Sequence, residues 1–189
     1  MGCILKIVLF VISGFFFGAV VLVALSVFLV VTGSPDTCSD REITPISEAV
    51  AAQLDDRWDQ FSADIAAAAS SIDVTESEAT SRARQYIEDE DVPVDDLRVY
   101  FCDDGTGQLA GQIEALGIDI DFVVTGHLEI SGDQPVAELD SIDIGNMPGF
   151  VADTVFGILL NDDARTLELD ENLLGSEISD GLIRINGGP

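Results

Sequence analysis

The residue types that perform most enzyme chemistry are scarce in this 189-residue chain. Its single histidine, His127, lies within an alternating polar and apolar stretch, where a histidine is usually a surface residue that changes charge near neutral pH. The only lysine is Lys6, so Schiff-base and Ser–Lys chemistry have no candidate later in the chain. Neither a Gly-x-Ser-x-Gly elbow nor a glycine-rich phosphate loop occurs. We therefore expect no catalytic residue, and a protein that is not an enzyme.

Acidic residues are abundant, but their spacing defines no metal site. With 35 Asp and Glu residues, pairs of carboxylates arise by chance. Calcium would suit them best, because oxygen donors stand at a turn (Asp103, Asp104) and on one strand face (Asp119, Asp121). Neither pair fits the EF-hand spacing, and no CxxC or histidine cluster indicates zinc. We expect no metal and no cofactor.

Two cysteines, Cys38 and Cys102, are expected to form a disulfide. Both follow the apolar segment Ile7 to Val31, which is interpreted below as a membrane anchor. They are therefore expected on its extracytoplasmic side, where disulfides persist. The bridge would close a loop of about 64 residues, which in the chain-entropy model stabilises the fold by on the order of 4 kcal/mol.

An uncharged segment, Ile7 to Val31, indicates where the protein resides. As a helix it would rise roughly 37 Å, enough to cross a hydrocarbon core of about 30 Å. Lys6 precedes it and acids follow it, which places the N-terminus in the cytoplasm. We expect a cytoplasmic N-terminus and transmembrane anchor (1–33), a stalk (34–43) and an extracytoplasmic domain (44–189). A cleaved signal peptide is the alternative, although its apolar region is usually shorter.

The net charge of −27 constrains the partners. Such a surface repels phosphate backbones and anionic headgroups, so we expect no nucleic acid and no polybasic membrane patch. An acid-rich, lysine-poor composition is also typical of adaptation to high salt, where screening removes self-repulsion. The same composition would suit an ordinary soluble surface or a calcium-rich exterior.

Apolar spacing predicts two or three helices. Thr44 and Pro45 resemble the N-cap and first residue of a helix that continues to about Ser70, and Thr75 and Glu78 form a capping box that starts the next. The first helix has an apolar stripe of Ile46, Val50, Leu54, Phe61 and Ile65. The second has an apolar face of Ala79, Ala83, Tyr86 and Ile87. A third, nearly all apolar, is expected over 150–160.

From Val94 the period changes from 3.6 to 2, which predicts strands packed as one coiled antiparallel sheet. We expect them over 94–102, 109–117, 118–130, 136–144, 166–170 and 181–186. The strand over 118–130 is unusually long and should bend at Gly126. The apolar phase slips after Leu139, which predicts a bulge near Asp140-Ser141. The fold class is therefore α+β.

The stretch from Val74 to Ile144 has a recognisable pattern. It opens with V-T-E-S-E at a helix start, continues with L-R-V-Y-F-C-D-D-G-T-G and a long alternating strand, and reaches I-G-N-M-P-G-F before a helix. This pattern is similar to the YpmS-like group of membrane-anchored bacterial proteins. More distantly it resembles the tubular lipid-binding (TULIP-like) folds, whose coiled sheet and long helix form a groove for acyl chains. The resemblance implies no catalytic residue.

These observations predict a membrane-anchored, extracytoplasmic, non-enzymatic module that binds lipid or another apolar ligand. The expected lining residues are Ile120, Phe122, Val124, Phe150, Val155, Phe156 and Leu159. The alternative is a structural or protein-interaction domain of the cell envelope that acts through its acidic surface. An open apolar cavity would favour the first and a filled core the second.

Overall fold

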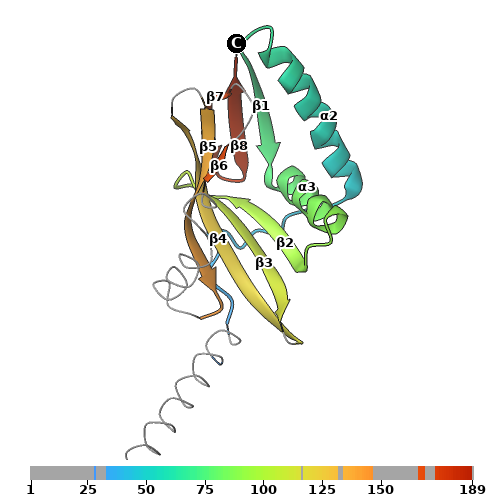
Figure 1. Cartoon of the computed structure of the whole chain (residues 1–189), viewed down its shortest axis with the longest axis vertical. Coiled ribbons are helices and arrows are strands. Elements are labelled where there is room, and N and C mark those ends of the chain that lie inside the picture. The colour runs from blue at the N-terminus through green and yellow to red at the C-terminus, as the bar shows by residue number, and fades with distance from the viewer. Residues whose placement is uncertain are drawn as a thin grey trace, which may run out of the picture.

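A computed structural model describes residue 28 and residues 33–115, 117–131, 134–146, 166–168 and 173–188, which form an α+β fold (Figure 1). Two described helices lie beside two antiparallel sheets. The expected anchor, Ile7 to Val31, lies outside these residues except for Phe28, and so does the helix expected over 150–160. Within the part of the chain that is described, no helix is long and apolar enough to cross a membrane.

The elements follow one another in the order α2, β1, α3, then β2 to β8. The helices are α2 (Glu48–Ile65) and α3 (Glu76–Asp89). The strands are β1 (Ser70–Thr75), β2 (Val94–Phe101), β3 (Gly107–Ala115), β4 (Ile118–Ser131), β5 (Gln134–Ile144), β6 (Thr166–Glu168), β7 (Leu173–Ser179) and β8 (Leu182–Gly187). The large sheet has the order β2-β3-β4-β5-β6, and the small sheet has the order β1-β8-β7.

The prediction of one sheet was wrong. Strand β1 pairs with β8 at the other end of the chain, so that Asp73 lies opposite Arg184, and β7 completes a separate sheet. Strand β7 was not predicted. Its signal was the two-residue turn Asp180-Gly181 between apolar alternations, where Gly181 has a φ of +81° that favours glycine.

Helix α2 begins later than predicted. Ser47, not Thr44, is the N-cap, and its Oγ accepts a hydrogen bond from the Val50 N–H at 3.3 Å. The helix also ends at Ile65, because the chain turns there and enters β1 at Ser70. The predicted stripe is otherwise confirmed for Leu54, Phe61 and Ile65, which are buried in the core beside the small sheet.

Helix α3 starts at the predicted capping box: Thr75 Oγ1 accepts from the Glu78 N–H, and Glu78 accepts from the Thr75 N–H. The helix then lies along the edge strand β2 (Figure 1). Side chains four residues apart on α3 bond alternate residues of β2. Glu76 Oε1 accepts from Phe101 N (2.9 Å), Thr80 Oγ1 accepts from Val99 N (2.9 Å), and Arg84 Nε donates to Leu97 O (2.7 Å).

We call Glu76, Thr80 and Arg84 the polar ladder. Four helical residues rise about 6 Å and two strand residues about 6.6 Å, so the two periods match over this length. The ladder satisfies backbone groups that an edge strand would otherwise expose. Thr80 is fully buried, whereas Tyr86 on the apolar face of α3 is 57% exposed. Helix α3 therefore packs against β2 through polar side chains. Its apolar face is not used for packing against that strand.

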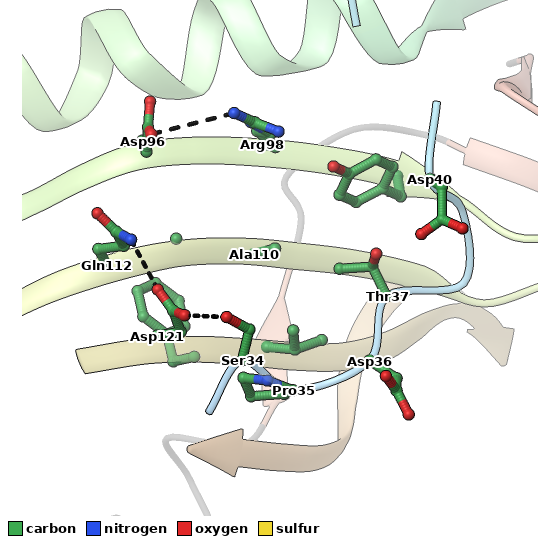
Figure 2. Close-up of a pocket in the computed structure, with 14 residues that line it drawn as sticks. Ser34, Pro35, Asp36, Thr37, Asp40, Asp96, Arg98, Ala110, Gln112 and Asp121 are labelled. Atoms are coloured by element: carbon green, nitrogen blue, oxygen red, sulfur yellow. Dashed lines mark hydrogen bonds and ion pairs between the residues drawn. The ribbon is translucent and has the colours of Figure 1, made fainter. Parts of the chain in front are cut away.

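The large sheet is built around β4, whose length confirms the predicted long strand. The predicted bulge is also confirmed, because Thr125 pairs with Ser141 and Gly126 with Leu139, so Asp140 has no partner across the ladder. The N-terminal segment, residues 34–43, was expected to be a stalk, and its residues Ser34 to Asp40 lie on the polar face of this sheet (Figure 2).

The N-terminal segment is joined to the large sheet at several points. Cys38 and Cys102 form a disulfide, with their Cα atoms 5.8 Å apart, as the sequence predicted. The Cys38 N–H also donates to Gln108 Oε1 at 2.7 Å, and Ser34 Oγ donates to Asp121. The N-terminal segment is therefore fixed to the domain at Ser34 and at Cys38.

Candidate functional site

The candidate site is an open apolar groove between the large sheet and the layer formed by α2, α3 and the small sheet. Its main cavity has a volume of about 630 Å³. The lining residues come from α2 (Leu54, Trp58), α3 (Ala79, Arg82, Ala83, Tyr86, Ile87), the small sheet (Val74, Ile183, Ile185) and the large sheet (Leu97, Leu109). Arg82 is the charged member of this lining.

A second cavity of about 280 Å³ continues the groove along the large sheet. It shares Leu109 and Ile183 with the main cavity, so the two form one elongated apolar groove. Its other lining residues include Val99, Phe101, Val124, Leu128, Leu139 and Ile178, with His127 beside them. Apolar side chains from both sheets thus border the whole length of the groove.

The polar ladder explains why the groove is apolar and open. It fixes α3 to the edge of β2, so the face that carries Ala83 and Tyr86 does not pack on that strand. Tyr86 remains largely exposed, and Ile87 is half-buried. Apolar surface left in water costs about 25 cal/mol per Å² relative to burial, so this face gains by binding an apolar molecule.

The sequence prediction placed only part of the lining. Val124 lies in the groove. Phe122 does not, because a Cβ on Gly111 would lie 3.0 Å from the Phe122 ring, which packs over that glycine on β3. Ile120, half-buried further along β4, is not among the groove residues either. Four other predicted residues lie outside the described part of the chain: Phe150, Val155, Phe156 and Leu159.

The residues that the prediction missed lie mainly on α3. The apolar spacing of Ala79, Ala83, Tyr86 and Ile87 was visible in the sequence, but such a face usually packs into a core. The missing signal was the second stripe on the same helix, Glu76, Thr80 and Arg84, at spacings of four. That stripe contacts β2 and so frees the apolar face for the groove.

His127 has a partner that the sequence did not reveal. Its Nδ1 lies 2.9 Å from both carboxylate oxygens of Asp140. A carboxylate accepts hydrogen bonds, so Nδ1 carries the hydrogen in this pair. The β5 bulge explains the contact, because it removes Asp140 from the ladder beside the residues that pair with Gly126 and His127. Of the two residues, His127 is the one that lines the second cavity.

A different cavity, of about 430 Å³, lies between the N-terminal segment and the polar face of the large sheet (Figure 2). Several of its polar side chains bond to one another. Asp121 accepts from Gln112 Nε2 at 2.7 Å and from Ser34 Oγ, and Arg98 lies 4.0 Å from Asp96. These contacts attach the N-terminal segment to the sheet and do not resemble a ligand site.

Two of the four carboxylates considered for calcium have other roles. Asp121 is engaged as just described, and Asp104 closes the turn before β3 by accepting from the Thr106 N–H (3.0 Å) and hydroxyl (2.7 Å). The hydrogen bond from the Thr106 hydroxyl is the main reason that the pKa of Asp104 lies below its usual value. Across the described residues, no group of three or more His, Cys, Asp or Glu side chains is arranged to hold a metal ion.

The arginines of the described chain are held by carboxylates. Each of the six forms an ion pair with Asp or Glu: Arg41 with Glu76 and Asp180, Arg57 with Glu78, Arg82 with Asp55, Arg84 and Arg98 with Asp96, and Arg184 with Asp73. The hydrogen bond from Arg184 is the largest influence on Asp73, and it lowers the pKa of that carboxyl.

Comparison of the chain with protein-family models, with curated protein sequences and with solved structures returned no match. The resemblance to YpmS-like proteins and to tubular lipid-binding folds therefore stays a prediction. The functional argument consequently depends on the geometry of the groove.

Proposed function

We propose that the protein is a membrane-anchored, extracytoplasmic module that binds lipid or another apolar ligand in its apolar groove and catalyses no reaction. The observation that carries this proposal is the main cavity, open and lined almost entirely by apolar side chains. Its volume of about 630 Å³ lies within the range of roughly 300–1,000 Å³ that is typical of small-molecule sites.

The expected anchor would keep the domain close to a source of apolar ligands, the lipid bilayer. Ser34 is bonded to Asp121 only three residues after Val31, where the apolar segment of the sequence ends. The disulfide at Cys38 then holds the same segment to the sheet. With Ile7 to Val31 in a bilayer, this short connection would keep the domain close to the membrane surface.

The single tryptophan offers a direct test, because Trp58 lines the main cavity. The full-length chain is reconstituted in zwitterionic lipid nanodiscs that contain a long-chain alcohol brominated along its chain. Bromine quenches indole fluorescence only at close range, so entry of the chain into the groove should quench Trp58. The unbrominated alcohol provides the reference intensity.

A matched pair of variants assigns the quenching to the groove. Ala83→Asp places a carboxylate in the lining of the main cavity, and Ala52→Asp makes the same change at an exposed position of α2. Burying an unpaired carboxylate costs more than about 1.4 kcal/mol, so Ala83→Asp should weaken binding by tenfold or more. Ala52→Asp should bind like the wild type. Absence of quenching in the wild-type protein would favour the interaction-domain alternative.

A further inference from the structure

The charges around the groove indicate which class of apolar ligand it accepts, an inference that rests on the proposed function. Arg82 borders the main cavity, and its Nε lies 2.7 Å from Asp55 Oδ1. The positive charge that borders the main cavity therefore already has a carboxylate beside it.

The other end of the groove has the same character. His127, which lines the second cavity together with the polar Gln108, is bonded through Nδ1 to Asp140. If the imidazole is protonated, the pair is neutral overall, and if it is not, the pair carries the negative charge of Asp140. In neither state does this pair present a net positive charge to a ligand.

An anionic headgroup would therefore have to displace a carboxylate from an existing ion pair. It would also approach a chain whose formal net charge is −27, and that field opposes any anion. The same field attracts a cationic headgroup, but Asp55 and Asp140 already have partners that such a headgroup would have to displace. An uncharged headgroup displaces neither partner, and Arg82 and Gln108 are hydrogen-bonding residues in the lining of the two cavities.

We propose that the groove binds a long-chain lipid with an uncharged polar headgroup, such as an alcohol or an ester, and discriminates against fatty-acid carboxylates. Arg82 and Asp55 act together as a neutral rim at the main cavity. The ion pair thus disfavours a fatty-acid carboxylate, which would have to compete with Asp55 for Arg82.

The test compares three brominated probes that share one saturated chain of about sixteen carbons and end in an alcohol, a carboxylate or a quaternary ammonium group. Each is added at equal mole fraction to nanodiscs that carry the full-length protein, and Trp58 quenching is measured. The bromine content of the recovered nanodiscs corrects for unequal partition of the probes. We expect the alcohol to half-saturate quenching at a concentration at least tenfold lower than either charged probe.

Asp55→Asn provides the matched control, because it removes the carboxylate from Arg82 without changing the groove lining. This variant should increase quenching by the carboxylate probe severalfold and leave quenching by the alcohol unchanged. A second measurement needs no variant: raising the salt from about 0.1 M to 1 M shortens the screening length from about 10 Å to 3 Å. Carboxylate binding should then rise, while alcohol binding should not.

The outcomes separate this inference from the proposed function. Quenching by the carboxylate or ammonium probe that equals or exceeds quenching by the alcohol would overturn the inference and leave the groove as a lipid site. An Asp55→Asn protein that folds but shows unchanged carboxylate binding would also overturn the role of the ion pair. Failure of all three probes to quench Trp58 would reject the proposed function itself.

Discussion

The polar ladder makes a quantitative prediction at Thr80. The substitution Thr80→Val keeps the shape of the side chain and removes the oxygen that accepts the Val99 N–H at 2.9 Å. Thr80 is fully buried, so water cannot replace that oxygen. Leaving a buried N–H without an acceptor costs about 1–3 kcal/mol. For a domain of this size, that loss lowers the midpoint of thermal unfolding by roughly 2–12 °C.

The assay is urea unfolding of the full-length chain in detergent micelles, followed by the fluorescence of Trp58. Thr44→Val is the control, because it makes the same change at an exposed position and should alter the free energy of unfolding by less than about 0.5 kcal/mol. Since the ladder also positions α3, Thr80→Val should weaken alcohol binding in the groove. If Thr80→Val were as stable as Thr44→Val, the account of how α3 is held to β2 would be refuted.

Three further predictions concern the whole domain. Replacing Cys38 and Cys102 by serine should lower the free energy of unfolding by about 4 kcal/mol, measured by urea unfolding, because a loop of 64 residues is opened. The lowered folded-state pKa of Asp73 means that its pairing with Arg184 stabilises the fold above pH 3.8 and is lost as the pH falls further. The thermal midpoint should therefore drop in acid, and less so in Asp73→Asn; equal acid sensitivity of both proteins would contradict this. The midpoint should also be higher in molar salt than in dilute buffer, because salt screens the net charge of −27, and an unchanged midpoint would argue against that repulsion.

Features determined by neighbouring residues could be predicted from the sequence. The capping box at Thr75 and Glu78 depends on residues three apart, and the bulge at Asp140 shows as a slip in an alternation of period two. The long strand β4 follows from the same alternation. In each case the determining contacts lie within one element or between adjacent strands.

Features that depend on distant partners could not be predicted in this way. Nothing local indicates that Asp73 lies opposite Arg184, which is 111 residues away, and this pairing creates the second sheet. The polar ladder likewise has meaning only once β2 lies beside α3. For this reason the predicted lining lies on β4 and on the helix expected over 150–160, where the apolar patterns are strongest, although α3 supplies much of the main cavity.

The most direct test of the central claim is to locate a bound lipid chain on the protein. A long-chain alcohol with a photoactivatable diazirine in its chain is added to nanodiscs that carry the full-length protein, irradiated, and the labelled residues are mapped by mass spectrometry. We predict labelling of the groove residues Ala83, Tyr86, Leu97 and Leu109 that is lost in Ala83→Asp. Labelling confined to residues 1–33, with none on α3, β2 or β3, would contradict the proposal that this groove binds lipid.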